Sequence, residues 1–319
     1  MIILTGGCGF IGSNVLASLN CRGLTDIVVV DEFDTSEKWK NLVGKRFSEL
    51  LGKEQLFPFL QTAGGVDAII HLGACSSTVE KDSHYLLENN YRYSKQLAIW
   101  AFEHNARFIY ASSAATYGDG SRGFSDAHEL LEQYEPLNMY GFSKHLFDLW
   151  LKREGLLERA VGLKYFNVYG PNEYHKGRMA SVILKMVPDV QREGKIRLFR
   201  SSEPEKFADG DQVRDFLYVK DAAEMTVQFL DCKLGGIFNV GTGQEHTWNQ
   251  MARGVIKGMG GMGEVEYITM PPDLVGKYQN YTCADMTKSH AHRLYMPRYS
   301  LEAAVVDYVQ NYVLCGRYV

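Results

Sequence analysis

Short apolar runs alternate with longer amphipathic segments along the first half of the chain. The apolar runs cover residues 2–5, 27–31, 68–74, 107–112 and 161–167. Between them, residues 12–22, 85–104 and 140–153 carry apolar side chains at helical spacing. Uninterrupted apolar strands that alternate with helices indicate a parallel sheet covered on both faces. The pattern therefore predicts an α/β fold with a doubly wound parallel sheet.

The pattern changes after Asn167. Residues 170–212 mix glycine, proline, charged and aromatic residues, and the polar stretch 201–212 reads as a loop. Strand patterns return at 215–219 and 237–240 with a helical segment, 221–230, between them. Ser300 is placed to cap an amphipathic helix that extends to residue 312. Without a clean linker, two parts of the chain are expected to interleave.

Composition and charge narrow the function classes. The net charge of −4 provides no basic excess for nucleic acid, and no apolar run near the start is long enough to span a membrane. The opening residues 1–5 lack the charged region and cleavage site of a secretory signal, so a cytoplasmic location is expected. The six cysteines form no C-x-x-C pair and are expected to be reduced thiols, and the histidines show no metal-binding spacing.

A glycine-rich loop follows the first strand and opens a helix. Gly6 suits a tight turn, Gly9 lets the backbone approach a pyrophosphate, and Gly12 allows close packing of the helix. The helix N-terminus supplies N–H groups and a positive dipole end to that anion. Asp31 ends the next strand at the position where a Rossmann fold binds the ribose. Ser13 rather than lysine follows Gly12, which disfavours a nucleoside triphosphatase.

The choice between NAD and NADP is less direct. Asp31 can bind a ribose 2′-hydroxyl and would repel a 2′-phosphate, and Glu32 adds to that repulsion. Lys38 and Lys53 could instead provide positive charge for a phosphate. The residues alone favour NAD.

A tyrosine and a lysine begin the helical segment 140–153. The i, i+4 spacing places Tyr140 and Lys144 on one face. A free tyrosine has a pKa of about 10, and the adjacent ammonium is expected to favour the phenolate that a base requires. Ser112 and Ser113 end the fourth strand, where either hydroxyl could bond a substrate oxygen. The pattern predicts hydride transfer assisted by a tyrosine acid–base group.

These motifs together resemble the extended short-chain dehydrogenase/reductase family of nucleotide-sugar enzymes. The resemblance rests on the glycine loop, the stretch 111–118, Tyr140 with Lys144, and the stretches 165–171, 214–221 and 238–243. Residues 73–78, 175–182 and 276–279 resemble the branch that epimerises C6 of an ADP-heptose for lipopolysaccharide core synthesis. The resemblance covers nearly the whole chain and implies a homo-oligomer, a pentamer in that branch.

The resemblance implies a division of the chain and a set of site residues. A Rossmann domain is expected from residues 1–168, 214–242 and about 270–289, and a smaller α/β substrate-binding domain from 169–213, 243–269 and 290–319. NADP is the implied cofactor, with contacts from Gly6, Gly9, Phe10, Ile11, Gly12, Asp31, Glu32, Lys38, Lys53, Leu72, Gly73, Ala74, Cys75, Ser76, Asn89, Lys144, Val168 and Lys176. The ADP-heptose is implied to contact Ser113, Asn167, Arg178, Lys185, Phe199, Arg200, Ser201, Ser202, Arg214 and Tyr278. Arg178 and Lys185 depart from the residues that other members carry at those places.

The implied reaction removes hydride from C6 and returns it to the opposite face of a 6-ketone. Two faces call for two proton-transfer groups, and Tyr140 and Lys176 are the expected pair, assisted by Lys144 and Ser113. A related 4-epimerase or 4,6-dehydratase is the alternative, although Ala114 and Ala115 stand where a dehydratase usually has an acid–base pair. A non-catalytic dinucleotide sensor is a third possibility, disfavoured because both Tyr140 and Lys144 are present.

Overall fold

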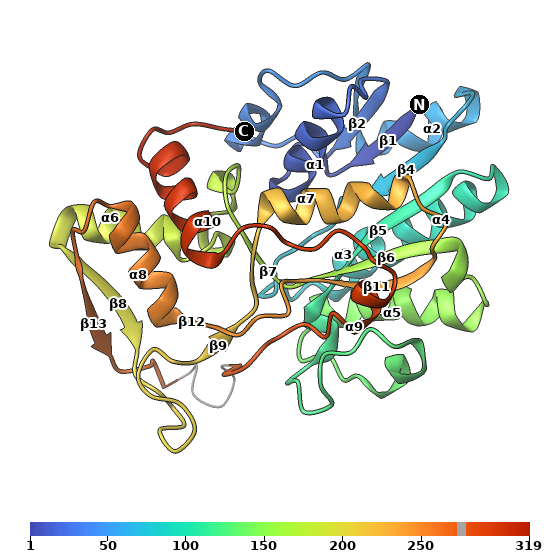
Figure 1. Cartoon of the computed structure of the whole chain (residues 1–319). Helices are drawn as coiled ribbons and strands as arrows, with labels where there is room; N and C mark the ends of the chain where they lie inside the picture. Colours follow the sequence, from blue (N-terminus) through green and yellow to red (C-terminus); the bar gives the residue numbers. More distant parts are fainter. Residues whose placement is uncertain (273–278) are drawn as a thin grey trace.

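A parallel sheet forms the centre of the larger part of the molecule (Figure 1). The computed structural model describes residues 1–272 and 279–319, and within these ranges the sheet has seven strands in the order β11-β6-β5-β4-β1-β2-β3. The strands are β1 (Ile2–Thr5), β2 (Ile27–Asp31), β3 (Glu49–Gly52), β4 (Ala68–His71), β5 (Arg107–Ser113), β6 (Ala160–Tyr165) and β11 (Gly236–Val240). All of the pairings are parallel.

Alternate side chains of the strands supply the cores on both faces of the sheet. Ile2 and Leu4 of β1 belong to one cluster of buried side chains, while Ile3 belongs to the other. The first cluster packs under α1 (Phe10–Cys21) and α7 (Val219–Val227), and the second under α2 (Leu56–Thr62), α4 (Tyr93–Glu103) and α5 (Met139–Arg153). Burial on both faces explains the uninterrupted apolar strands and confirms the doubly wound α/β fold.

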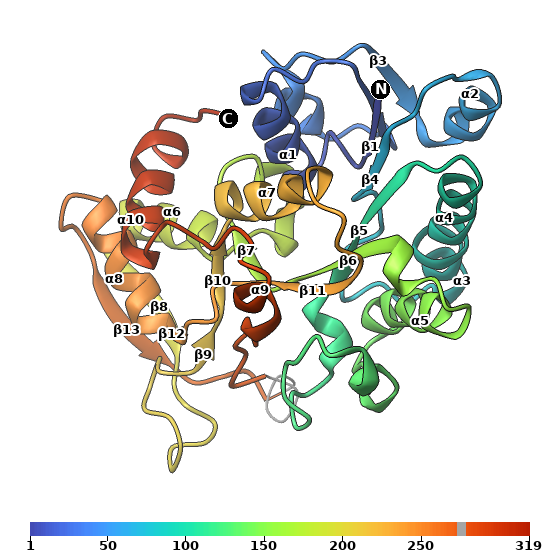
Figure 2. The same ribbon diagram turned by 45° about the vertical axis from the view of Figure 1, so that its right-hand side comes forward.

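A third core lies beside the sheet (Figures 1 and 2). It is formed by α6 (Ile183–Glu193), α8 (Trp248–Gly258), α10 (Leu301–Tyr308) and the parallel pair β8 (Lys195–Phe199) and β13 (Glu264–Ile268). Short pairs connect the two parts, namely β7 (Asn167–Tyr169) with β10 (Phe216–Tyr218), and β9 (Val213–Arg214) with β12 (His246–Thr247). The interleaving expected from the sequence is therefore present, whereas the domain boundaries remain a prediction.

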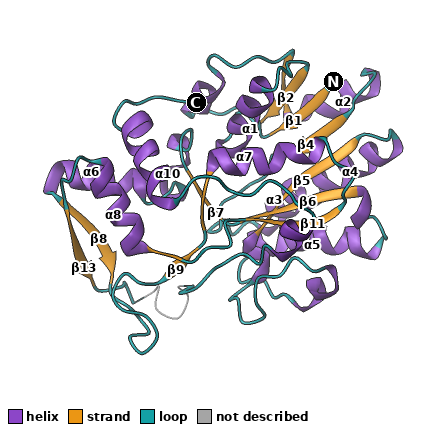
Figure 3. Ribbon diagram, viewed as in Figure 1, coloured by secondary structure: helices purple, strands orange, loops and turns teal. Residues whose placement is uncertain are grey.

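Several elements differ from the sequence-based expectation (Figure 3). The third expected strand stops at His71, and residues 72–76 turn away from the sheet. The expected helix 85–104 is divided into α3 (Ser83–Leu86), a π-helical segment (Leu87–Arg92) and α4. The sequence did not indicate β3, β8 or β13, because these strands lie at edges and mix polar with apolar residues.

The buried imidazole of His71 ties the end of β4 to its neighbours. Its Nδ1 lies 2.6 Å from Thr5 Oγ1, and its Nε2 lies 2.8 Å from Ser94 Oγ. Burial, assisted by the positive charge of Lys144, lowers the pKa of His71 to about 3. His71 is therefore neutral in the folded protein at pH 7, and protonating it would place an uncompensated charge in the core.

We expect this histidine to make the fold sensitive to acid. The unfolded chain, with a histidine pKa of about 6.5, binds the extra proton as the pH falls below that value, while the folded protein does not until about pH 3. Stability should therefore fall by about 2 kcal/mol between pH 7 and 5 through this group. Urea unfolding at both pH values should show a smaller loss for His71→Gln, whereas the exposed His84→Gln should keep the wild-type loss. An unchanged loss in His71→Gln would contradict this assignment.

Candidate active site

The glycine loop between β1 and α1 has the backbone conformation expected from the sequence. Gly6 has φ +70°, and a Cβ on it would lie 2.6 Å from the backbone nitrogen of Gly73. A Cβ on Gly12 would lie 2.0 Å from the carbonyl oxygen of Gly6, so larger residues are excluded at both positions. A groove beside the loop is lined by residues 9–12 and by the turn 72–76. The first-turn N–H groups of α1, which have no partner within a helix, are therefore available to an anion in this groove.

The turn 72–76 is fixed by an asparagine that the sequence analysis did not name. Asn90 Oδ1 accepts a hydrogen bond from the Cys75 N–H at 2.9 Å, and its Nδ2 donates to the Cys75 carbonyl oxygen at 2.9 Å. The same amide nitrogen donates to Ser143 Oγ of α5 at 3.0 Å. In the sequence, Asn90 is distinguished only by standing next to Asn89 within a helical segment. Asn90 therefore joins the groove to the helix that carries Tyr140 and Lys144.

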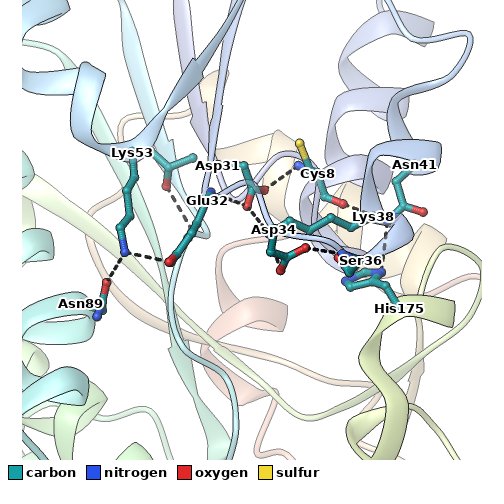
Figure 4. Close-up of polar contacts among 12 residues, drawn as sticks. Cys8, Asp31, Glu32, Asp34, Ser36, Lys38, Asn41, Lys53, Asn89 and His175 are labelled. Carbon is teal, nitrogen blue, oxygen red and sulfur yellow. Dashed lines mark hydrogen bonds and ion pairs between the residues drawn. The ribbon is translucent and has the colours of Figure 1, made fainter.

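Asp31 is directed toward the glycine loop (Figure 4). Its Oδ2 accepts a hydrogen bond from the Cys8 N–H at 2.8 Å. Its Oδ1 accepts from the Glu32 N–H at 2.8 Å and from Lys38 Nζ at 3.1 Å. Both carboxylate oxygens are thus engaged within the protein, and Lys38 compensates the charge. The repulsion of a 2′-phosphate that the sequence suggested is correspondingly weakened.

A second lysine–carboxylate pair lies across the same end of the groove (Figure 4). Lys53 Nζ lies 2.8 Å from Glu32 Oε2 and donates to Asn89 Oδ1 at 3.0 Å. Residues of this pair and of the Asp31–Lys38 pair line a cavity of about 310 Å³. The structure therefore brings together five of the expected cofactor residues: Asp31, Glu32, Lys38, Lys53 and Asn89.

Tyr140 and Lys144 lie at the start of α5, next to the end of β5. Asn138 caps the helix, because its Oδ1 accepts a hydrogen bond from the Gly141 N–H at 2.8 Å. Lys144 is 4% exposed and its Nζ donates to the Ala111 carbonyl oxygen at 2.9 Å. Ala111 also lines the groove. This contact places the Tyr140–Lys144 face beside the proposed cofactor site.

The two serines at the end of β5 have different environments. Ser112 is 2% exposed, and its hydroxyl donates to the buried carboxylate of Asp148 at 2.8 Å. The side chain of Ser113 is hydrogen-bonded to that of Tyr140. Successive strand residues point to opposite faces of a sheet, so only one of them can reach the site. The geometry favours Ser113 as the partner of Tyr140.

The expectation for the pKa of Tyr140 is wrong in its direction. Burial raises the pKa of Tyr140, and the hydrogen bond with Ser113 opposes that effect without reversing it. Burial also lowers the pKa of Lys144 to about 8, against the opposing charge of Asp148. Sequence spacing places the ammonium near the phenol, but it does not include the cost of removing a phenolate from water.

Lys176 lies in a short 3-10 segment, η7 (Tyr174–Met179), and lines the same groove as the turn 72–76. Its Nζ lies 5.1 Å from the centre of the Phe10 ring. Burial lowers the pKa of Lys176, and the charge of Glu173 acts in the opposite direction. A half-buried lysine with a lowered pKa is better suited to proton transfer at neutral pH than a solvated one.

Two of the expected substrate residues lie at a different cavity. Lys185 and Phe199 line a cavity of about 270 Å³ together with Trp248 and Gln212, two residues that the sequence analysis missed. The guanidinium of Arg214 lies 5.7 Å from the Trp248 ring. Arg200 Nη1 lies 3.2 Å from Asp209 Oδ2, and Asp209 Oδ1 accepts a hydrogen bond from the Ser201 N–H at 2.9 Å. Trp248 gave a weak sequence signal, because it stands just inside a Thr247–Gln250 capping box.

Other expected residues do not line these cavities. Val168 packs against the core cluster beside α1, and Asn167 Oδ1 accepts a hydrogen bond from Thr282 Oγ1 at 3.3 Å. Arg178 is exposed, and Asn280 Nδ2 lies 3.5 Å from Ser202 Oγ. Tyr278, together with Gly276 and Lys277 of the same motif, lies outside the described residues.

The sequence profile of the NAD dependent epimerase/dehydratase family matches residues 2–241, which contain the glycine loop, Tyr140, Lys144 and Lys176. The chain belongs to this family. Its membership supports a nicotinamide dinucleotide as the class of cofactor. Among the described residues, no group of histidine, cysteine and acidic side chains could hold a metal ion, and no helix is long and apolar enough to cross a membrane.

Relatives of this epimerase/dehydratase family member include nucleotide-sugar epimerases. It is 50% identical over 317 residues to the ADP-L-glycero-D-manno-heptose-6-epimerase of Nitratidesulfovibrio vulgaris strain DP4, covering 98% of both chains. The crystal structure of the Helicobacter pylori ADP-L-glycero-D-manno-heptose-6-epimerase superimposes with a TM-score of 0.81 at 28% identity, covering 97% of this chain and 95% of that one. The UDP-glucose 4-epimerase of Thermus thermophilus, solved as a complex with NAD, has a TM-score of 0.72 at 25% identity, covering 97% of each chain.

Proposed function

We propose that this family member epimerises C6 of ADP-D-glycero-D-manno-heptose to ADP-L-glycero-D-manno-heptose. The 50% identity to a curated heptose epimerase over nearly the whole of both chains supports this substrate. The observation that carries the proposal is that two proton-transfer candidates come from different elements. Lys176 of η7 lines the groove, and Tyr140 of α5 precedes by one turn Lys144, whose Nζ donates to the groove residue Ala111. Such a pair suits a reaction that must act on both faces of one carbon.

The residues of the groove fit a dinucleotide. The glycine loop leaves room where side chains would collide, and the N-terminus of α1 offers N–H groups to a pyrophosphate. The bound dinucleotide supplies the acceptor and donor of hydride. Lys144 uses one ammonium donor for the Ala111 carbonyl, and two further donors can hold a ribose hydroxyl.

Tyr140 and Ser113 are proposed to act on the C6 oxygen. Their mutual hydrogen bond places two hydroxyls together, so that Ser113 orients the oxygen while Tyr140 takes or returns its proton. Because burial raises the pKa of Tyr140, the phenolate needs a positive charge close by, and an oxidised nicotinamide has that charge. Lys176 is proposed to serve the other face, since burial lowers its pKa.

A turnover assay tests this function. Purified protein should convert each ADP-heptose epimer to the same equilibrium mixture, followed by proton NMR, without added dinucleotide. Release of the bound dinucleotide by denaturation identifies the cofactor in the same sample. Turnover of a UDP-hexose at C4 in place of the heptose would favour the 4-epimerase alternative, and binding without turnover of any nucleotide sugar would favour a sensor.

The residues that follow β5 do not support the dehydratase alternative. Ser113 is followed by a 3-10 turn, Ala114–Tyr117, whose first two residues are alanines. The Ala115 N–H donates to Ser113 Oγ at 3.1 Å, so the turn orients the serine. A methyl group cannot transfer the protons that loss of water from a sugar requires.

We further propose that NADP, rather than NAD, is the preferred cofactor. Both oxygens of Asp31 are engaged within the protein, and Lys38 and Lys53 place two ammonium groups at the same end of the groove. A 2′-phosphate can attract both lysines away from their carboxylate partners. The family name and the NAD complex of the T. thermophilus relative point to NAD instead, so the cofactor needs a direct measurement.

Charge reversal at Lys38 should discriminate between the two cofactors. Lys38→Glu is expected to weaken NADP binding about tenfold or more relative to NAD, because a charge-assisted hydrogen bond is replaced by repulsion. Lys40→Glu on the same 3-10 segment (Glu37–Leu42) is the control, since Lys40 pairs with Glu37 at the surface. Titration calorimetry with both dinucleotides measures the ratio. If Lys38→Glu weakened the binding of NADP and NAD equally, or if the purified protein held NAD tightly, NADP would be rejected as the preferred cofactor.

A homo-oligomer in the cytoplasm remains our expectation for the assembled enzyme. Light scattering of the purified protein tests the oligomeric state directly.

A further inference from the structure

The loop that carries Lys176 is joined to the cofactor groove on its inner side. Asn14 Nδ2 of α1 donates a hydrogen bond to the Pro171 carbonyl oxygen at 3.0 Å. The buried Asn41 donates through Nδ2 to the Asn172 carbonyl oxygen at 3.1 Å and to the Cys8 carbonyl oxygen at 2.9 Å. Asn41 thus connects the glycine loop directly to the chain just before Lys176.

The outer side of the same loop is bound by residues 317–319. Tyr174 Oη donates to the Arg317 carbonyl oxygen at 2.8 Å, and its ring meets the Tyr318 ring edge to face with 5.0 Å between centres. The Val319 N–H donates to Asn172 Oδ1 at 2.9 Å. Figures 1 and 2 show this segment crossing from α10 in the smaller part toward α1.

Asn172 is the point at which the inner and outer contacts meet. Its backbone adopts φ +77°, a left-handed conformation that asparagine tolerates better than most residues. Its Nδ2 donates to Ser13 Oγ of α1 at 3.0 Å while its Oδ1 accepts from Val319. Residues 317–319 therefore help to hold a strained turn four residues before Lys176.

The carboxylate of Glu173 closes the loop on itself. It accepts hydrogen bonds from the Ser181 N–H and the Ser181 hydroxyl, both at 2.6 Å, and from the Gly170 N–H at 3.3 Å. These bonds hold the two ends of the loop together, but they do not fix the loop against the groove. The loop is held against the groove by the inner contacts with Asn14 and Asn41 and by the outer contacts of Asn172 and Tyr174 with residues 317–319.

We infer that residues 317–319 form a positioning segment for Lys176, so that the outer contacts of Asn172 and Tyr174 hold its amine at the groove. The inference rests on the proposed role of Lys176 in proton transfer. A displacement of about 1 Å in a reacting group can cost up to about 10²-fold in rate. Loss of the segment should therefore affect proton transfer at one face of the substrate more than dinucleotide binding.

The test compares Tyr318→Ala, which removes the ring contact with Tyr174, with Tyr318→Phe, which keeps it. Tyr318→Ala should lower kcat for epimerisation about tenfold, and a chain ending at residue 316 should lose more. Tyr318→Phe should stay within twofold of wild type. Dinucleotide affinity should change less than threefold in all three proteins.

The half-reactions separate a positioning role from a general structural one. In a two-base enzyme each epimer is deprotonated by a different group, so transient reduction of the bound dinucleotide by one epimer depends on Lys176. Stopped-flow absorbance should show that Tyr318→Ala slows reduction by the same epimer that Lys176→Met slows. Tyr174→Phe, which keeps the ring contact and loses one hydrogen bond, should show the same asymmetry at a smaller magnitude.

Three outcomes would overturn the inference. The positioning role would be overturned if Tyr318→Ala and the shortened chain both epimerised at a near-normal rate. The proposed function would still stand in that case, provided that Lys176→Met is impaired. Equal slowing of reduction by both epimers would assign the segment to general stability. Normal epimerisation by Lys176→Met would remove the role of Lys176 and the positioning role with it.

Discussion

Replacing Tyr140 by phenylalanine should lower kcat for epimerisation by about 10²–10⁴-fold, the range that general acid–base catalysis typically contributes. The substitution removes one hydroxyl from a ring at the start of α5 and breaks its hydrogen bond with Ser113. The fold and the bound dinucleotide should be retained, because the ring itself is kept. Proton NMR of ADP-heptose turnover measures the rate, and denaturation of the variant measures its dinucleotide content.

Tyr134→Phe is a matched control for the loss of a buried tyrosine hydroxyl. Tyr134 donates to the Ser125 carbonyl oxygen at 2.6 Å, and its loss should cost about 1 kcal/mol of stability with activity within a few fold of wild type. A Tyr140→Phe variant that kept more than about a tenth of the wild-type rate would be incompatible with acid–base catalysis by this hydroxyl.

Lys176→Met should severely lower epimerisation in both directions, by about 10²-fold or more, because each direction uses both proton-transfer groups once. Dinucleotide affinity should stay within a few fold, since methionine is similar in length to lysine and can still cover the Phe10 ring, whose centre lies 5.1 Å from Lys176 Nζ. Initial rates with each ADP-heptose epimer, together with a dinucleotide titration, separate the two effects.

Lys152→Met is the corresponding control, because Lys152 lies at the far end of α5 and is 3.8 Å from Glu132 at the surface. Its activity should be unchanged. If Lys176→Met epimerised at a near-normal rate, the second proton would have to come from water or from Tyr140 itself, and the two-base interpretation of the site would be rejected.

The sequence alone was sufficient to predict those features that depend on residues close together in the chain. The runs 2–5 and 27–31 coincide with β1 and β2, because a strand buried on both faces must be apolar throughout. The glycine loop was recognisable because Gly6 and Gly12 occupy positions where a side chain would collide with nearby backbone. Tyr140 and Lys144 could be placed on one face because helical spacing fixes their separation.

Features that depend on distant segments were decided only by the tertiary structure. Ser113 is distinguished from Ser112 by Asp148, which lies more than thirty residues further along the chain and binds the Ser112 hydroxyl. The pKa of Tyr140 is raised because burial outweighs the hydrogen bond with Ser113, and burial is a property of the packed fold. Asp31 is directed toward Cys8, and Asn172 is held by Val319, through contacts that no periodicity encodes. Local spacing thus predicted the elements and the chemical groups, whereas packing between distant segments determined their orientation, their charge state and the partners that hold them.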